Sequence, residues 1–311
     1  MAFNWKTFQT RTLTAVIFAA VMLTGLLWNQ WSFFILFAII HFGCWWEYFN
    51  LLEKIHNTTY HHYMRVGFML MGFAIMLWFC GPEFQINNHG LKESLAFPIS
   101  VAGFVMLTLG IFQTKSIKPK ALGTAALGLI YISLCWGLML SLFFSQITES
   151  IQILPFPNHP VETVYDVEKP WLIPLVLISS IWISDTMAYI VGSVIGKTPL
   201  SKISSKKTWE GTIGGVILGT VVTGVIFSNV NTDKIIDKLY GDEEWYIIAT
   251  IASIFGTLGD LLESKLKRMA EVKDSGNIMP GHGGFLDRFD SMLLAIPAVW
   301  LYIALFMVVK P

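Results

Sequence analysis

Charged side chains are scarce in this sequence of 311 residues. Only 14% of the residues are Asp, Glu, Lys or Arg, whereas 54% are hydrophobic, and the mean hydropathy is +0.59. A soluble globular domain carries about 25% charged residues. The formal net charge is zero, so no excess of positive charge points to nucleic acid as a partner. The composition therefore excludes an ordinary soluble domain and indicates a protein that crosses a membrane several times.

Cysteine, linkers and repeats are also sparse or missing. The three cysteines, Cys44, Cys80 and Cys135, each lie inside an apolar run and lack the spacing of a metal site. We expect them to be lipid-facing or packing residues. The sequence has no Pro- or Ser-rich linker, no low-complexity tract and no internal repeat, which disfavours a transporter built from duplicated halves.

Long apolar runs dominate what is present. A helix needs about 20 apolar residues to cross a bilayer, and the sequence offers nine candidates: 12–28, 32–52, 66–81, 97–113, 121–145, 171–195, 211–230, 245–263 and 291–309. We predict an all-α polytopic integral membrane protein with about nine transmembrane helices. Residues 1–145 would hold five spans, 146–170 an external loop and 171–311 four spans. We expect the first span to be retained, with a cleaved signal peptide as the alternative.

The placement of basic residues predicts the topology. When alternate loops are assigned to the two sides of the membrane, sixteen of the 21 Lys and Arg residues fall on one side and five on the other. Basic residues concentrate in cytoplasmic loops. We therefore expect a cytoplasmic N-terminus, an external C-terminus, and cytoplasmic positions for residues 196–210 and 264–290. The compact size suggests a bacterial inner membrane.

Two features of residues 259–291, GDLLESKLKRMAEVKDSGNIMPGHGGFLDRFDS, stand apart from the surrounding apolar sequence. The first is the end of an apolar helix, where Asp260, Ser264 and Lys267 would share one face. An acidic side chain at that depth is costly and usually has a partner or a function.

The second feature is the stretch PGHGGFLDRFD, residues 280–290. Its glycines allow the backbone to approach a ligand closely and to turn amides toward anionic oxygen. Asp287 and Asp290 would share a face if the next helix begins there. Carboxylates that bind Mg²⁺ and leave its other positions to water and phosphate are common in nucleotide enzymes.

By contrast, Gly211, Gly215 and Gly219 recur every four residues within one apolar run. This spacing is typical of close helix–helix contacts in membranes.

The order and spacing of residues 259–291 resemble the signature of the CTP:phosphatidate cytidylyltransferases, also called CDP-diacylglycerol synthases. Two further segments resemble the same family: ISDTMAYIVGSVIGK at 183–197, and SSKKTWEG at 204–211, where Ser205 replaces the family's usual proline. A weaker match is WWEYFNLL at 45–52, which places Glu47 in an apolar span. The resemblance is dense over 171–295 and thin over the first four spans.

The resemblance implies an enzyme of phospholipid biosynthesis that joins CTP to phosphatidate, releasing pyrophosphate. It assigns Asp260 and Asp287 to a divalent cation, taken to be Mg²⁺, with a second metal ion left open. The residues expected at the catalytic centre are Ser264, Lys267, Arg268, Lys273, Asp274, His282, Arg288 and Asp290. Those expected to bind substrate are Asp185, Lys206, Lys207, Thr208, Glu210, Gly283 and Gly284. The partners expected are the two substrates and the lipid bilayer, and a homodimer is left open.

Two alternatives remain at this point. A related CTP-dependent enzyme acting on another lipid, such as a CDP-archaeol synthase or a polyprenol kinase, would share much of this pattern. A transporter would also place acids in its spans, but it would line a continuous path across the membrane with polar residues, whereas here they gather at one side.

Overall fold

The computed structural model describes most of the chain. The described residues are 5–81, 84–86, 88–114, 117–144, 170–201, 203–204, 206–230, 241–278 and 283–307. The predicted external loop 146–170 (apart from its last residue), Ser205 and His282 lie outside this set.

Helices make up nearly all of the described structure. The first half contains, in order, α1 (Trp5–Leu27), α2 (Gln30–His56), α3 (His62–Trp78), the short strands β1 (Gln85–Ile86) and β2 (His89–Gly90), the π-helical turn η1 (Lys92–Ala96), α4 (Phe97–Gln113), α5 (Pro119–Gly128), the π-helical segment η2 (Leu129–Leu134) and α6 (Cys135–Phe144). The second half contains α7 (Leu172–Ile195), α8 (Trp209–Val230), α10 (Asp242–Met269), α11 (Leu286–Tyr302) and the π-helical turn η3 (Ile303–Met307).

The all-α membrane architecture expected from the sequence is confirmed. Within the described residues, seven helical stretches are long and apolar enough to span a bilayer. Two more apolar helices, Thr12–Leu27 and His62–Trp78, are shorter. Each predicted span coincides with one of these nine stretches, although the full count of membrane crossings remains a prediction. One difference is that α10 continues to Met269, past the predicted end of the span at residue 263, and Lys267 in this extension pairs with Glu263 and Asp287.

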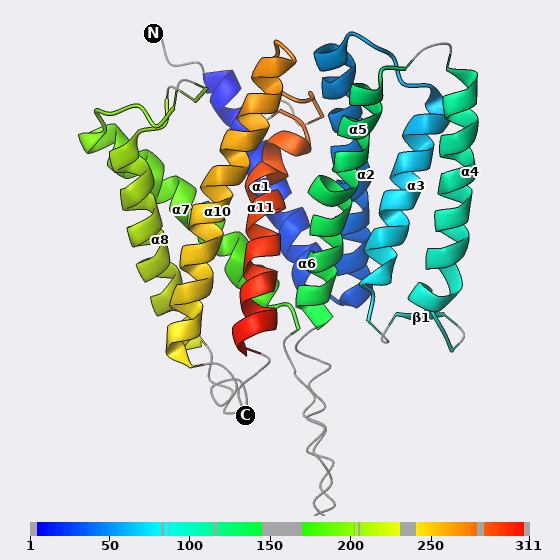
Figure 1. The fold of residues 1–311 in the computed structure, drawn as a ribbon. Helices are drawn as coiled ribbons and strands as arrows, with labels where there is room; N and C mark the ends of the chain where they lie inside the picture. Colours follow the sequence, from blue (N-terminus) through cyan, green and yellow to red (C-terminus); the bar gives the residue numbers. More distant parts are fainter. Residues whose placement is uncertain are drawn as a thin grey trace, which may run out of the picture.

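The helices run alternately up and down, and this brings the helix ends that carry the predicted functional segments to one face (Figure 1). The end of α7, the start of α8, the end of α10 and the start of α11 all lie at the upper end in that view, as does the end of α2. The β1–β2 hairpin lies at the opposite end. The sequence segments predicted to be functional therefore meet at one side of the bundle.

Glycines allow the helices of the second half to approach closely. A Cβ atom at Gly211, Gly215 or Gly219 would collide with α7, at Ala188 or Ser184 among other contacts. The predicted role of this glycine stripe in helix packing is confirmed. At Gly259 a Cβ would press against the backbone of Asp290 and Ser291. This contact seats the end of α10 directly against the start of α11.

Aromatic and sulfur side chains fill the core of the first half. Trp45, Trp136 and Phe33 are fully buried. All three cysteines are buried and unpaired, which confirms a packing role rather than a lipid-facing one. The η2 segment places Ser133 inside this core, where its hydroxyl accepts a hydrogen bond from Trp45 Nε1 at 2.8 Å and lies 3.0 Å from His41 Nε2. This polar contact ties α2 to η2.

Candidate active site

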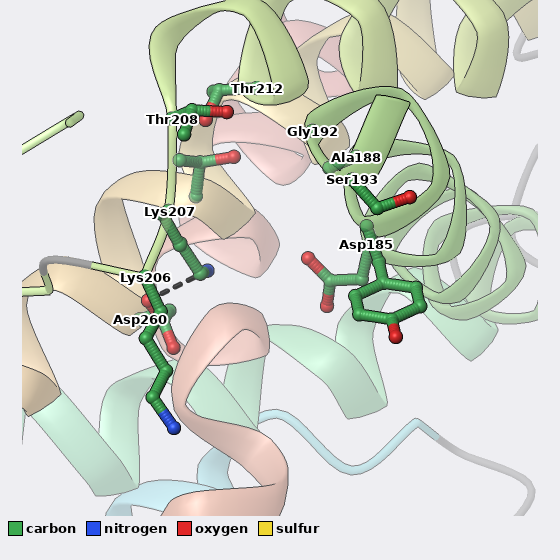
Figure 2. Close-up of a pocket in the computed structure, with 11 residues that line it drawn as sticks. Asp185, Ala188, Gly192, Ser193, Lys206, Lys207, Thr208, Thr212 and Asp260 are labelled. Atoms are coloured by element: carbon green, nitrogen blue, oxygen red, sulfur yellow. Dashed lines mark ion pairs between the residues drawn. The ribbon is translucent and has the colours of Figure 1, made fainter. Parts of the chain in front are cut away.

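A cavity of about 450 Å³ lies where the loop between α7 and α8 faces α10 (Figure 2). Its walls carry Asp185, Ser193, Lys206, Lys207, Thr208 and Asp260, among others. In Figure 2, Asp185 from α7 faces the two lysines and Asp260 across the cavity. The structure therefore brings four of the seven predicted substrate-binding residues together with one predicted metal ligand.

The loop between α7 and α8 has a tight, internally bonded shape. An isolated β-bridge joins Pro199 to Thr208, and the Leu200 amide donates to the Lys207 carbonyl at 2.7 Å. Glu210 accepts hydrogen bonds from the Thr198 amide at 3.1 Å and from the Thr198 hydroxyl at 2.8 Å. The Glu210 carboxylate is thus engaged by the loop itself and is absent from the lining of the cavity. It fixes the loop that presents the lysines.

Lys207 reaches across to α10. Its ammonium lies 2.8 Å from Asp260 Oδ2 and is the ion partner of that carboxylate. Burial lowers the pKa of Lys207, but the carboxylates of Asp260 and Asp185 outweigh this effect, so the pKa lies above its ordinary value. Lys207 therefore carries a full positive charge in the cavity at neutral pH.

A second cluster of charges lies between α10 and α11. Lys267 forms ion pairs with Glu263 on its own helix and with Asp287, whose Oδ1 lies 2.7 Å from the ammonium. The other oxygen of Asp287 accepts from the amides of Ser275 and Gly284, both at 2.8 Å, and lies 2.9 Å from the Ser275 hydroxyl. Asp287 is thereby held in one orientation by groups from three parts of segment 259–291.

The two clusters meet in a smaller cavity of about 170 Å³. Its lining includes four carboxylates, those of Asp185, Asp260, Asp287 and Asp290, together with Arg288. The four acids come from α7, α10 and α11. The predicted pair Asp260 and Asp287 therefore lines one space although the two residues belong to different helices.

These carboxylates fit a divalent cation. Within the described residues, no three His, Cys, Asp or Glu side chains form a ready-made metal cage. Mg²⁺ seldom uses such a cage, since it binds through one or two carboxylates and completes its shell with water and substrate phosphate. Asp260 Oδ2 is buried, and among the described residues the ammonium of Lys207 is the partner found for it. A pair of carboxylates in this setting has the donor chemistry that Mg²⁺ requires.

A third cavity opens between α1 and α7. This groove of about 420 Å³ is lined by Thr14, Ala15, Phe18, Ala19, Trp182, Asp185, Thr186 and Arg288. Most of these side chains are small or apolar, and Arg288 and Asp185 stand among them. Asp185 also lines the other two cavities. The three cavities are therefore neighbours around one aspartate.

The remaining predicted residues that the structure describes do not line these three cavities, and they differ in exposure. Ser264 is half-buried, while Arg268, Lys273 and Asp274 are exposed. Gly283 has a φ of +83°, a conformation that favours glycine, and Gly284 donates to Asp287. His282 lies outside the described residues.

Three residues of the site were missing from the predicted set: Glu47, Ser275 and Glu263. Glu47 on α2 is buried and contacts the loop that precedes α11. Its charge within an apolar run was visible in the sequence, but its partners are more than 200 residues away. Ser275 and Glu263 lie inside segment 259–291, and no local pattern distinguishes them from solvated residues.

Comparison with known proteins adds independent information. The model of the cytidylyltransferase family matches residues 9–306. A phosphatidate cytidylyltransferase of Synechocystis sp. is 29% identical over 305 residues, covering 95% of this chain and 96% of that protein.

Other relatives are more similar over a shorter region. A phosphatidate cytidylyltransferase of Bacillus subtilis is 47% identical over 127 residues, which is 40% of this chain and 45% of the relative. One from Staphylococcus haemolyticus is 48% identical over 118 residues, covering 38% and 43%. The chain thus matches less than half the length of these two proteins. Since the family match extends over almost the entire sequence and the fold and acidic cavity agree with it, this chain belongs to the cytidylyltransferase family.

Proposed function

We propose that this integral membrane protein is a phosphatidate cytidylyltransferase, which converts CTP and phosphatidate into CDP-diacylglycerol and pyrophosphate. The observation that carries the proposal is the meeting of three cavities at Asp185: one that holds two lysines, one acidic and one largely apolar. Such an arrangement suits a reaction between a water-soluble nucleotide and a membrane lipid. The names of the relatives support the same substrates.

In the proposed reaction, a phosphate oxygen of phosphatidate attacks the α-phosphorus of CTP. The new P–O bond forms as the bond between the α-phosphorus and the bridging oxygen breaks, and pyrophosphate leaves with that oxygen and its electron pair. Both reactants are anions, so positioning and charge neutralisation account for most of the catalysis. No side chain has to form a covalent intermediate.

The cavity that holds the two lysines suits the triphosphate. Lys206, Lys207 and Thr208 all line it and provide two ammonium groups and a hydroxyl. Thr208 Oγ1 already accepts from the Gly211 amide at 3.2 Å, which leaves its proton free to donate to a phosphate oxygen. These groups would bind and orient the nucleotide.

The groove between α1 and α7 suits the lipid. Phe18 and Trp182 provide apolar surface, and Arg288 offers a forked donor for a phosphate headgroup. The acidic cavity, which Arg288 also lines, would then hold the reacting phosphates between the two substrates.

Asp260 and Asp287 are the proposed ligands of the divalent cation, and Asp290 the nearest further carboxylate. When bound, the cation supplies positive charge to the transferring phosphate and the leaving pyrophosphate. Lys207 and Lys267, which pair with these two aspartates, would supply ammonium groups to phosphate oxygens of the substrates. We place this site on the cytoplasmic side of a bacterial inner membrane, because that side supplies CTP.

Pyrophosphate release tests the proposal. Purified protein in lipid nanodiscs is expected to release pyrophosphate from CTP only when both phosphatidate and Mg²⁺ are present. Diacylglycerol, an archaeal diether phosphate and a polyprenol serve as comparison lipids. Preference for one of these comparison lipids over phosphatidate would contradict the proposed substrate.

A further inference from the structure

Glu47 is an unusual residue for its place in the fold. It lies on α2, within an apolar stretch, and only 1% of it is exposed. A buried carboxylate is costly unless hydrogen bonds or opposite charges compensate for it. Its partners therefore explain why this position holds a charge.

The partners of Glu47 all belong to the segment that precedes and begins α11. Glu47 Oε1 accepts from the Phe285 amide at 2.9 Å, and Oε2 accepts from the Leu286 amide at 2.8 Å and from the Ser275 hydroxyl at 2.7 Å. Phe285 is the N-cap position of α11 and has no side-chain cap of its own. A carboxylate from α2 thus satisfies two backbone amides at the start of α11, which have no partner within the helix, and its charge suits the positive end of the helix.

The loop is also shaped to enclose this carboxylate. A Cβ atom at either Gly276 or Gly284 would collide with the Glu47 side chain. Two glycines on opposite sides of the loop therefore allow the backbone to close around one acid.

Ser275 connects Glu47 to Asp287. Its hydroxyl lies 2.7 Å from Glu47 Oε2 and 2.9 Å from Asp287 Oδ2, and its amide donates to the same Asp287 oxygen. The Gly284 amide, on the other side of the loop, also donates to Asp287. The groups that orient Asp287 are therefore the same groups that Glu47 holds.

We infer that Glu47 is a positioning residue, which anchors residues 275–286 from α2 so that Asp287 presents its carboxylate to the acidic cavity. This inference rests on the proposed function, in which Asp287 binds the divalent cation. Groups that orient a metal ligand typically change metal affinity or activity by about 10- to 100-fold when they are lost.

Glu47→Gln is the direct test. It preserves shape, but one of two acceptor oxygens becomes an amide nitrogen that cannot accept from a backbone N–H. Ser275→Ala is the milder variant, which removes only the bridge to Asp287. Glu53→Gln is the matched control: Glu53 is on the same helix and accepts from the Tyr60 amide, but it pairs with Arg65 and has no hydrogen bond or ion pair with the described residues of the loop.

Four quantities are measured on the full chain in detergent: kcat and KM for CTP, Mn²⁺ affinity by electron paramagnetic resonance, and the temperature of thermal unfolding. We expect Glu47→Gln to lower kcat and Mn²⁺ affinity by about 10- to 100-fold, with KM changed by less than about twofold. Ser275→Ala should lower kcat and Mn²⁺ affinity by a smaller factor. Glu53→Gln should leave kcat and Mn²⁺ affinity unchanged.

Wild-type Mn²⁺ affinity in Glu47→Gln and Ser275→Ala would overturn the inference, because a purely structural role lowers only the amount of folded protein. Failure of the wild-type protein to bind Mn²⁺ would overturn it as well. If the wild type binds Mn²⁺ but transfers no cytidylyl group, the proposed function fails, while the Mn²⁺ comparison still decides the role of Glu47.

Discussion

The ammonium of Lys207 lies 2.8 Å from Asp260 Oδ2, so the loop between α7 and α8 is joined to α10 by opposite charges inside the larger cavity. The relationship links the two sequence regions that most resemble the family. It also places the positive charge of Lys207 directly beside a proposed metal ligand.

Replacing Lys207 with Ala should raise KM for CTP more than it lowers kcat, if the lysine binds the nucleotide equally well in the ground and transition states. A charge-assisted contact contributes about 1.5–3 kcal/mol, so we expect KM to rise by about 10- to 100-fold. Because the pKa of Lys207 is raised, the lysine stays protonated as the pH increases. The KM of the wild-type enzyme for CTP should therefore not rise through loss of this charge up to about pH 9. The control is Lys197→Ala, a nearby exposed lysine that does not line the cavity. Equal KM and kcat values in the Lys207→Ala and Lys197→Ala variants would mean that Lys207 has only a structural role, through its ion pair with Asp260.

Asp287→Asn should abolish most turnover and leave the protein folded. The amide retains the size of the carboxylate but loses the charge that pairs with Lys267. Since a catalytic cation supplies several kcal/mol, a loss of at least about 100-fold in kcat is expected. Asp260→Asn should behave alike, and the double variant should be little worse than either single variant, because residues that act as one unit are not additive. Turnover close to wild type in one variant, with unchanged Mg²⁺ dependence, would remove that residue from the metal site.

Gly284→Ala should reduce turnover sharply, because its Cβ would collide with the Glu47 carboxylate. Gly123→Ala is the matched control, since a Cβ there meets no atom within 4 Å. Steady-state rates and thermal unfolding are compared for the two variants. Normal activity in Gly284→Ala would show that the loop tolerates displacement from Glu47.

Gly215→Val should separate α7 from α8. The added atoms press on Ala188 and Ser184, and overpacking of this kind costs about 1–3 kcal/mol. We expect a lower unfolding temperature in detergent than for Ile217→Val, a change on an exposed face of the same helix. An unchanged unfolding temperature would mean that α7 and α8 accommodate the larger side chain without a loss of stability.

Topology is tested by cysteine labelling. All three native cysteines are buried, so a cysteine introduced at Asn277 or Asn88 is the main reactive one. If residues 264–290 are cytoplasmic, an impermeant maleimide added to intact cells should label position 88 and spare position 277. The reverse pattern would invert the proposed orientation.

The sequence predicted the helices well, because each apolar run is a local property of 20 or so neighbouring residues. The glycine spacing at 211, 215 and 219 likewise predicted a contact that the structure contains. The polar residues of segment 259–291 predicted a functional site, and the structure places three of them, Asp260, Asp287 and Asp290, in the lining of one cavity.

Partners distant in sequence could not be predicted in the same way. Glu47 and Leu286 are 239 residues apart, and their hydrogen bond depends on how α2 packs beside α11. The pairing of Lys267 with Asp287 and of Lys207 with Asp260 likewise follows from helix packing. Helical periodicity places Asp260 and Lys267 on one face, but it does not say which neighbouring helix that face meets.

The most direct measurement follows the fate of labelled CTP. Purified protein in phosphatidate nanodiscs with Mg²⁺ is given CTP carrying ³²P at either the α or the γ position, and lipid and aqueous products are separated by extraction. Cytidylyl transfer predicts that the α label enters the lipid and the γ label leaves as pyrophosphate, with both reactions lost in Asp287→Asn. Appearance of the γ label in the lipid would mean kinase chemistry, and absence of both labels from the lipid would contradict the proposed activity.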